Sequence, residues 1–99
     1  MIQAAILGFG VVGSGVLEII KEHADHFSGK AGGVLNVKYI LDIRDFSAHP
    51  MAELFTNDFE TILNDPEVSV IAEVIGGVEP AYTYTKKALL AGKNVVTSN

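Results

Sequence analysis

The chain opens with a short apolar run, Met1 to Leu7, that passes directly into Gly8-Phe9-Gly10-Val11-Val12-Gly13. Helical periodicity follows from Val11 to Glu22, so the G-x-G-x-x-G run stands at a strand-to-helix joint. In that place the first glycine permits a tight turn and the second lets the main chain approach a pyrophosphate. The third lets helix and strand pack closely. The sequence therefore predicts a dinucleotide site formed by Gly8, Phe9, Gly10, Val11, Val12 and Gly13.

Four short runs, apolar and rich in β-branched residues, predict strands that are covered on both faces. Helical segments separate these runs, which indicates parallel pairing through right-handed crossovers. The predicted strands are Ile2–Leu7, Asn36–Asp42, Ser69–Ile75 and Asn94–Ser98, and the predicted helices are Val11–Glu22, Asp58–Leu63 and a last one from Pro80 to Gly92, with one further turn at Met51–Phe55. The expected fold is α/β, a Rossmann-type doubly wound parallel sheet truncated after the fourth strand.

Two helices show an apolar face and recognisable ends. The first should bury Val12, Val16, Ile19 and Ile20, and the last should bury Ala81, Tyr84, Thr85, Ala88 and Leu89. Pro80 suits the first helical position, and Gly92 suits the C-terminal cap. A flexible loop, Ser28–Gly33, is expected between the first helix and the second strand.

Composition excludes several classes of protein. Hydrophobic residues make up 48% of the 99 residues, which is enough for a core. The net charge of −5 disfavours nucleic acid and anionic membranes as partners. Without cysteine there is neither a disulfide framework nor a thiolate site. His23 and His26 are three residues apart, but a solvated helix end explains them better than a metal site. We expect a cytoplasmic protein that binds no metal.

Two charged residues at the end of the second predicted strand bear on the choice of cofactor. An acid in the position of Asp42 bonds the adenosine ribose hydroxyls in dinucleotide-binding folds, although 29 residues after Gly13 is longer than the usual spacing. Arg44 could hold a 2′-phosphate through bidentate bonds, which would favour NADP. It could equally form a surface pair with Asp42 or Asp45. The sequence leaves NAD and NADP both open.

The third predicted strand leads into Gly76-Gly77-Val78-Glu79-Pro80. Paired glycines after a strand indicate a turn with positive φ or the approach of a ligand. Since ligands bind at the carboxyl ends of strands in open α/β sheets, this run should lie beside the first glycine loop. Glu79 would either cap the last helix or contact the ligand. Glu73, inside the strand, must be paired or protonated if buried, and no role is assigned to it.

The chain resembles the N-terminal end of homoserine dehydrogenase. The resemblance is carried by Ile6-Leu7-Gly8-Phe9-Gly10-Val11-Val12-Gly13-Ser14-Gly15-Val16, by Glu73-Val74-Ile75-Gly76-Gly77-Val78-Glu79-Pro80 and by the run from Lys87 to Asn99, which contains Ala91-Gly92-Lys93-Asn94-Val95-Val96-Thr97-Ser98-Asn99. It spans nearly the whole chain except Ile43–Asn57. The two later runs are far more specific than the glycine fingerprint.

The resemblance implies an NAD(P)-dependent oxidoreductase that interconverts L-homoserine and L-aspartate 4-semialdehyde, a step in threonine, methionine and isoleucine biosynthesis. Gly8 to Gly13 would hold the pyrophosphate, while Gly76, Gly77, Glu79 and Ser98 would line the nicotinamide side. Residues 1–99 would then be an incomplete NAD(P)-binding domain. The family's catalytic lysine follows the T-[AS]-N run, so no catalytic residue is assigned in this chain. Members are usually dimers, which implies a homo-oligomer acting on a small-molecule substrate.

Two other functions remain open from the residues alone. One is a different Rossmann oxidoreductase, such as a semialdehyde or sugar dehydrogenase. The other is a non-catalytic module that senses a dinucleotide. The parallel strand at Asn94–Ser98 also suggests a fragment of a longer protein, because such strands are seldom left uncovered.

Overall fold

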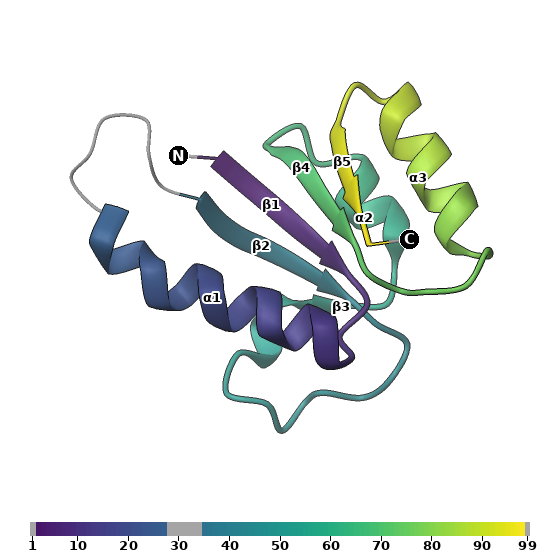
Figure 1. Ribbon diagram of the computed structural model, residues 1–99. Coiled ribbons are helices and arrows are strands. Elements are labelled where there is room, and N and C mark those ends of the chain that lie inside the picture. Colours follow the sequence, from purple (N-terminus) through teal and green to yellow (C-terminus); the bar gives the residue numbers. More distant parts are fainter. Residues whose placement is uncertain (1, 28–34, 99) are drawn as a thin grey trace.

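The computed structural model describes residues 2–27 and 35–98, and for residues 23–27 the backbone only (Figure 1). Its elements in chain order are β1 (Ile2–Leu7), α1 (Val11–Phe27), β2 (Leu35–Leu41), the 3₁₀ turn η1 (Ala52–Leu54), β3 (Phe55–Thr56), α2 (Phe59–Leu63), β4 (Val68–Glu73), α3 (Ala81–Leu90) and β5 (Asn94–Thr97). The predicted loop Ser28–Gly33 and the side chains of His23 and His26 lie outside the described residues.

The strands form one parallel sheet in the order β3-β2-β1-β4-β5. The Rossmann-type α/β fold is therefore confirmed, but the described residues contain five strands rather than four. The strand that the prediction missed is β3, which pairs Phe55 and Thr56 with Ile40 and Leu41. Two residues are too few to show a period of two, so only tertiary pairing reveals it.

The helices cover both faces of the sheet, as a doubly wound fold requires (Figure 1). Alternation along β1 separates the two cores. Ile6 packs with α1 and η1, whereas Ala5 and Leu7 pack with α2 and α3. A shift in register between β1 and β2 skips Lys38, so that Val37 and Ile40 both join the core beneath α1.

Helix α1 confirms half of its predicted stripe, Val16 and Ile20, and adds Leu17 to it. Leu17 is buried, and Val16 and Ile20 pack against the same core. Val12 and Ile19, which were predicted to face inward, are 55% and 59% exposed. The close approach of Gly13 to the end of β1 sets this rotation of the helix.

Helix α3 confirms most of its predicted signals. Ala81 and Ala88 are buried and Gly92 ends the helix with a φ of +84°, whereas Leu89 is exposed, contrary to prediction. Pro80 is not the first helical residue but the N-cap, and it follows a cis peptide bond.

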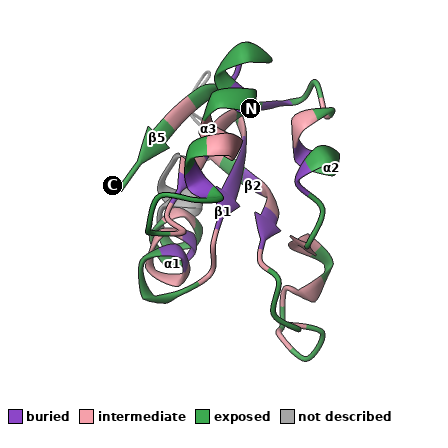
Figure 2. Ribbon diagram, turned by 90° about the vertical axis from the view of Figure 1, so that its right-hand side faces the viewer, coloured by how far each residue is buried: buried purple, intermediate pink, exposed green. Residues whose placement is uncertain are grey.

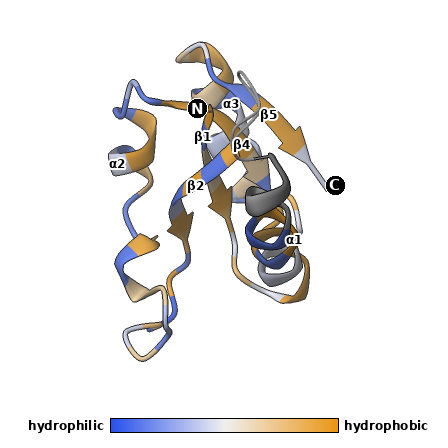
Figure 3. Cartoon of the chain, turned by 90° about the vertical axis from the view of Figure 1, so that its left-hand side faces the viewer, coloured by the Kyte–Doolittle hydropathy of each residue, from blue (hydrophilic) through white to orange (hydrophobic). Residues whose placement is uncertain are grey.

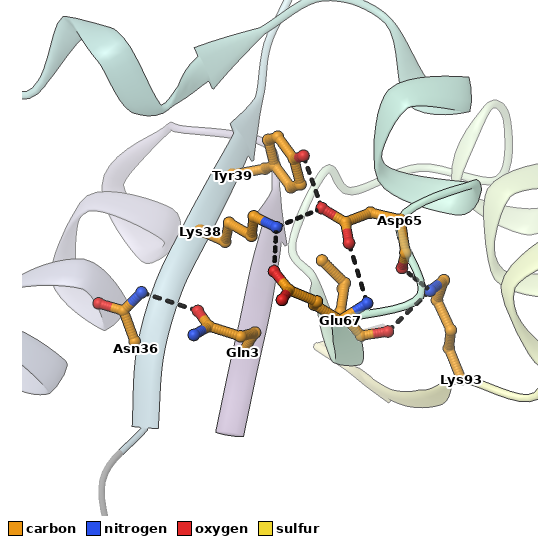
Figure 4. A network of polar contacts seen from close by, with 8 residues as sticks. Gln3, Asn36, Lys38, Tyr39, Asp65, Glu67 and Lys93 are labelled. Atoms are coloured by element: carbon orange, nitrogen blue, oxygen red, sulfur yellow. Dashed lines mark hydrogen bonds and ion pairs between the residues drawn. The ribbon is translucent and has the colours of Figure 1, made fainter. Parts of the chain in front are cut away.

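Polar contacts join the amino ends of the central strands (Figure 4). Lys38 Nζ lies 2.6 Å from carboxylate oxygens of both Asp65 and Glu67, and Tyr39 donates a hydrogen bond to Asp65. Hydrogen bonds from Lys38 and Tyr39 lower the pKa of Asp65 to about 2. Lys93 is buried and donates to the carbonyls of Asp65 and Val68, rather than serving the end of α3. These contacts are structural and lie away from the glycine loop.

Strand β5 forms one edge of the sheet. Figures 2 and 3 together show that it is both exposed and hydrophobic, and Val96 is 64% exposed. Across the described residues, no helix combines the length and the apolar character needed to span a membrane.

Candidate functional site

The loop after β1 is shaped by two close approaches of the main chain. Gly8 has a φ of +98°, and a Cβ there would lie 3.1 Å from the Cα of Ile75. A Cβ at Gly13 would overlap the carbonyl oxygen of Gly8. Both positions therefore need glycine for reasons of packing, as the sequence predicted for the turn and for the contact between helix and strand.

Gly10 differs from these two glycines because it faces open space. A Cβ at Gly10 would meet no atom within 4 Å. Ser14 N–H bonds to its carbonyl, so the helix starts here. The N–H groups of the first turn of α1 have no partner within the helix and carry its positive dipole end. An anion such as a pyrophosphate can reach this main chain without obstruction.

Asp42 and Arg44 form a bidentate ion pair at the end of β2. Arg44 donates to the two carboxylate oxygens at 3.0 and 2.8 Å. The surface pair that the sequence left open is thus present. The Asp42 side chain is only 8% exposed, whereas that of Arg44 is 60% exposed. The Arg44 guanidinium, aided by backbone N–H donors, holds the pKa of Asp42 well below its usual range.

The same pair holds the glycine loop through Phe9. The Phe9 N–H donates to Asp42 Oδ2 at 2.9 Å, and Arg44 donates to the Phe9 carbonyl at 3.0 Å. The Phe9 ring packs edge-on against Phe46 and Phe55, with centroids 5.3 and 4.9 Å away. Phe9, Asp42 and Arg44 therefore form one unit that joins the end of β2 to the loop after β1.

A mostly apolar cavity of about 170 Å³ opens beside this unit. It lies at the carboxyl ends of the strands, on the side of β1 opposite α1. Its lining residues come from five separate segments of the chain: Gly8, Leu41, Asp42, Ile43, Asn57, Ile75, Pro80 and Tyr84. A larger open cavity of about 540 Å³ lies over the connection from β2 to β3 and is lined by Arg44 among others. A flat ring with a polar edge could enter the smaller cavity and leave an attached sugar near Asp42.

The second glycine run lies at the same edge of the sheet, after β4. Gly76 and Gly77 have φ values of +85° and +73°, so both adopt the left-handed conformation that the paired glycines predicted. Glu79 accepts hydrogen bonds from the backbone N–H and the hydroxyl of Thr83, at 3.0 and 2.5 Å. It caps α3, which is one of the two roles that the sequence left open for it. Ser98 follows β5, and its N–H donates to the carbonyl of Glu73.

Sequence reasoning missed part of this edge. Ile75 and Tyr84 line the cavity, and Asn57 reaches it from the loop before α2. Tyr84 was predicted to lie on the apolar face of the last helix, but nothing local in the sequence indicated a cavity. Among residues 2–22 and 35–98, whose side chains the structure describes, no group of three or more metal-ligating side chains occurs.

Comparison with known proteins adds independent evidence. Residues 8–99 match the family described as homoserine dehydrogenase, NAD binding domain. The chain belongs to this family. It is 37% identical over 102 residues to a homoserine dehydrogenase of Bacillus subtilis, covering 99% of this chain and 23% of that protein. With the homoserine dehydrogenase of Lactococcus lactis it shares 39% identity over 104 residues, covering 99% and 24%.

A crystal structure of S. aureus homoserine dehydrogenase shows the same fold. The two superpose with a TM-score of 0.88 at 35% identity, covering 99% of this chain and 26% of that one. The chain thus spans about a quarter of the length of its homoserine dehydrogenase relatives. The NAD-binding domain family implies a nicotinamide dinucleotide as cofactor.

Proposed function

We propose that this chain is the cofactor-binding part of an oxidoreductase that interconverts L-homoserine and L-aspartate 4-semialdehyde with NAD(P)(H). The observation that carries the proposal is the unobstructed main chain at Gly10, near an apolar cavity that Asp42 helps to line. The names of the relatives support the substrate. The proposal includes a homo-oligomer in the cytoplasm.

The strand order supports a proposed position for each half of the cofactor. The chain passes from β1 outward to β2 and β3, then crosses to β4 and β5, so the topological switch lies between β1 and β4. With the pyrophosphate at Gly8–Gly13, adenosine lies toward β2, with its base in the smaller cavity and its ribose at Asp42. The nicotinamide then lies toward β4 and β5, where Gly76, Gly77 and Ser98 are found. Glu79, engaged with Thr83, supports the start of α3 there.

The nicotinamide supplies the hydride chemistry, and the protein binds and orients it. This chain contributes the main-chain donors for the pyrophosphate and the pocket for the base. The side chains that hold homoserine and exchange its proton are expected beyond Asn99.

The reaction can be tested directly on the natural gene product that contains this chain. We expect it to oxidise homoserine with NAD⁺ or NADP⁺, followed by the absorbance of the reduced nicotinamide. A protein that binds the dinucleotide but oxidises only another alcohol, such as a sugar, would point to a different Rossmann dehydrogenase. One that binds it and oxidises nothing would point to a sensing module.

The choice between NAD and NADP should depend on Arg44. A 2′-phosphate near Asp42 would be repelled by the carboxylate unless Arg44 neutralises both groups, so we propose that Arg44 turns toward the phosphate when NADP binds. A charge-assisted hydrogen bond contributes about 1.5–3 kcal/mol, or roughly 10–150-fold in affinity. We expect Arg44→Ala to weaken NADPH binding by about this factor in calorimetry and to change NADH binding little.

The matched control is Lys86→Ala, which removes an exposed cation from α3. It should leave both affinities unchanged. Equal losses of NADH and NADPH in Arg44→Ala would show instead that Arg44 acts only through its bond to the Phe9 carbonyl.

A further inference from the structure

Glu73 is the last residue of β4 and one of the most deeply buried side chains described, with 1% of its surface exposed. A buried carboxyl group is costly unless its oxygens are hydrogen-bonded. Here both oxygens accept: Oε1 from the hydroxyl of Thr97 at 2.6 Å and Oε2 from the N–H of Ile75 at 2.8 Å. The side chain is therefore fully engaged with protein and is not available to a ligand.

The partners of Glu73 belong to two different segments at the carboxyl edge of the sheet. Ile75 precedes the Gly76–Gly77 turn, and Thr97 ends β5. The main chain of Glu73 adds a second link to β5, because its carbonyl accepts from Ser98 N–H at 3.1 Å. One residue thus sets the spacing between the turn after β4 and the end of β5.

A third segment is tied in by packing. Ile75 lies against Gly8, since a Cβ on that glycine would come within 3.1 Å of the Ile75 Cα. A Cβ at Gly76 or Gly77 would meet no atom within 4 Å, so no other segment crowds the outer side of the turn after β4. The hydrogen bond from Ile75 N–H to Glu73 lies at the base of this turn.

We propose that Glu73 is a positioning residue, which holds the Gly76–Gly77 turn and the Thr97–Ser98 segment at the spacing that receives the nicotinamide half of the cofactor. It acts through Ile75 and Thr97 and does not touch the ligand. The inference rests on the proposed function, and it adds a residue for which the sequence alone suggested no role. Loss of the Glu73 contacts should loosen the nicotinamide end more than the adenosine end, where Ile75 is the cavity-lining residue that donates to Glu73.

The test compares two ligands on the natural gene product: NADH, and ADP-ribose, which lacks the nicotinamide ring. Glu73→Gln replaces one acceptor oxygen with an NH₂ donor, so the hydrogen bonds from Ile75 N–H and from the Thr97 hydroxyl cannot both be kept as they are. A net hydrogen bond of about 0.5–1.5 kcal/mol corresponds to a loss of up to roughly tenfold. We expect calorimetry to show NADH binding weakened several-fold, up to about tenfold, with ADP-ribose binding weakened clearly less. Turnover with saturating cofactor should fall as well.

Thr97→Val removes the same contact with little change of shape, so it keeps the test valid if Glu73→Gln does not fold. The double variant should bind NADH no more weakly than the weaker-binding single variant, because both substitutions alter the same contact, the one between residues 73 and 97. Glu67→Gln is the matched control. This exposed carboxylate precedes the other end of β4, and its replacement should leave the affinities for both ligands unchanged.

Equal weakening of NADH and ADP-ribose would show that Glu73 only supports the fold, and unchanged NADH binding in both single variants would overturn the proposal. A parent protein that binds neither ligand would instead contradict the proposed function, and this inference with it.

Discussion

Replacing Gly13 by alanine should destabilise the fold strongly. A Cβ at this position would overlap the Gly8 carbonyl oxygen and approach a Val74 methyl carbon at 3.3 Å. The oxygen belongs to the main chain after β1, so relief requires α1 to move away from the sheet. Overpacking of this kind costs about 1–3 kcal/mol and sometimes more. We expect the free energy of unfolding, measured with urea, to fall by at least about 3 kcal/mol.

Gly15→Ala is a closely matched control, two residues further along the same helix. A Cβ at Gly15 would meet nothing within 4 Å, so the substitution is free of clashes. Alanine is favoured over glycine in a helix by about 0.8–1 kcal/mol, and Gly15→Ala should therefore raise the stability. If both variants were as stable as the parent protein, the close approach of α1 to β1 would be refuted.

Gly10→Val should separate binding from folding. The φ of Gly10 lies outside the left-handed region, and a Cβ there has open space, so the fold should persist. Valine is a poor N-cap residue, which costs about 1 kcal/mol of stability. Its side chain would occupy the space proposed for the pyrophosphate. The loss of charge-assisted bonds of about 1.5–3 kcal/mol each predicts at least about a 100-fold weaker NADH affinity.

Calorimetry gives the affinity and circular dichroism gives the fold of the same sample. Gly15→Ala again serves as control and should bind NADH normally. A folded Gly10→Val protein with unchanged affinity would refute the assignment of the pyrophosphate to Gly8–Gly13.

Much of the architecture could be predicted because parallel strands covered on both faces leave a strong local signal. The observed bounds of β1 match the prediction, and those of β5 differ by one residue, although β5 is an exposed edge strand and not covered on both faces as predicted. The rotation of α1 could not be predicted from apolar periodicity, since Val12 and Leu17 are equally apolar. It follows from the contact between Gly13 and Gly8, which joins two elements.

The site was predictable only where it is local in sequence. The glycine loop and the turn at Gly76–Gly77 have conformations that depend on neighbouring residues, and both were predicted. The cavity was not, because Asn57, Ile75 and Tyr84 come together only through the strand order. The partner of Arg44 was left open for a similar reason: the bond to the Phe9 carbonyl depends on β1 and β2 being adjacent.

Asp42 and Arg44 bond both main-chain polar groups of Phe9. These bonds bear on how cofactor preference is inferred from related sequences. An acid at the end of the second strand is commonly taken as a marker of NAD use. In this chain the acid, Asp42, accepts a hydrogen bond from the Phe9 N–H of the glycine loop. Its presence is required by the local architecture whichever nicotinamide is bound, and it therefore carries little information about cofactor choice. On the role proposed above for Arg44, the residue to compare lies two positions later: a side chain at position 44 that can leave the acid and bind a 2′-phosphate would favour NADP.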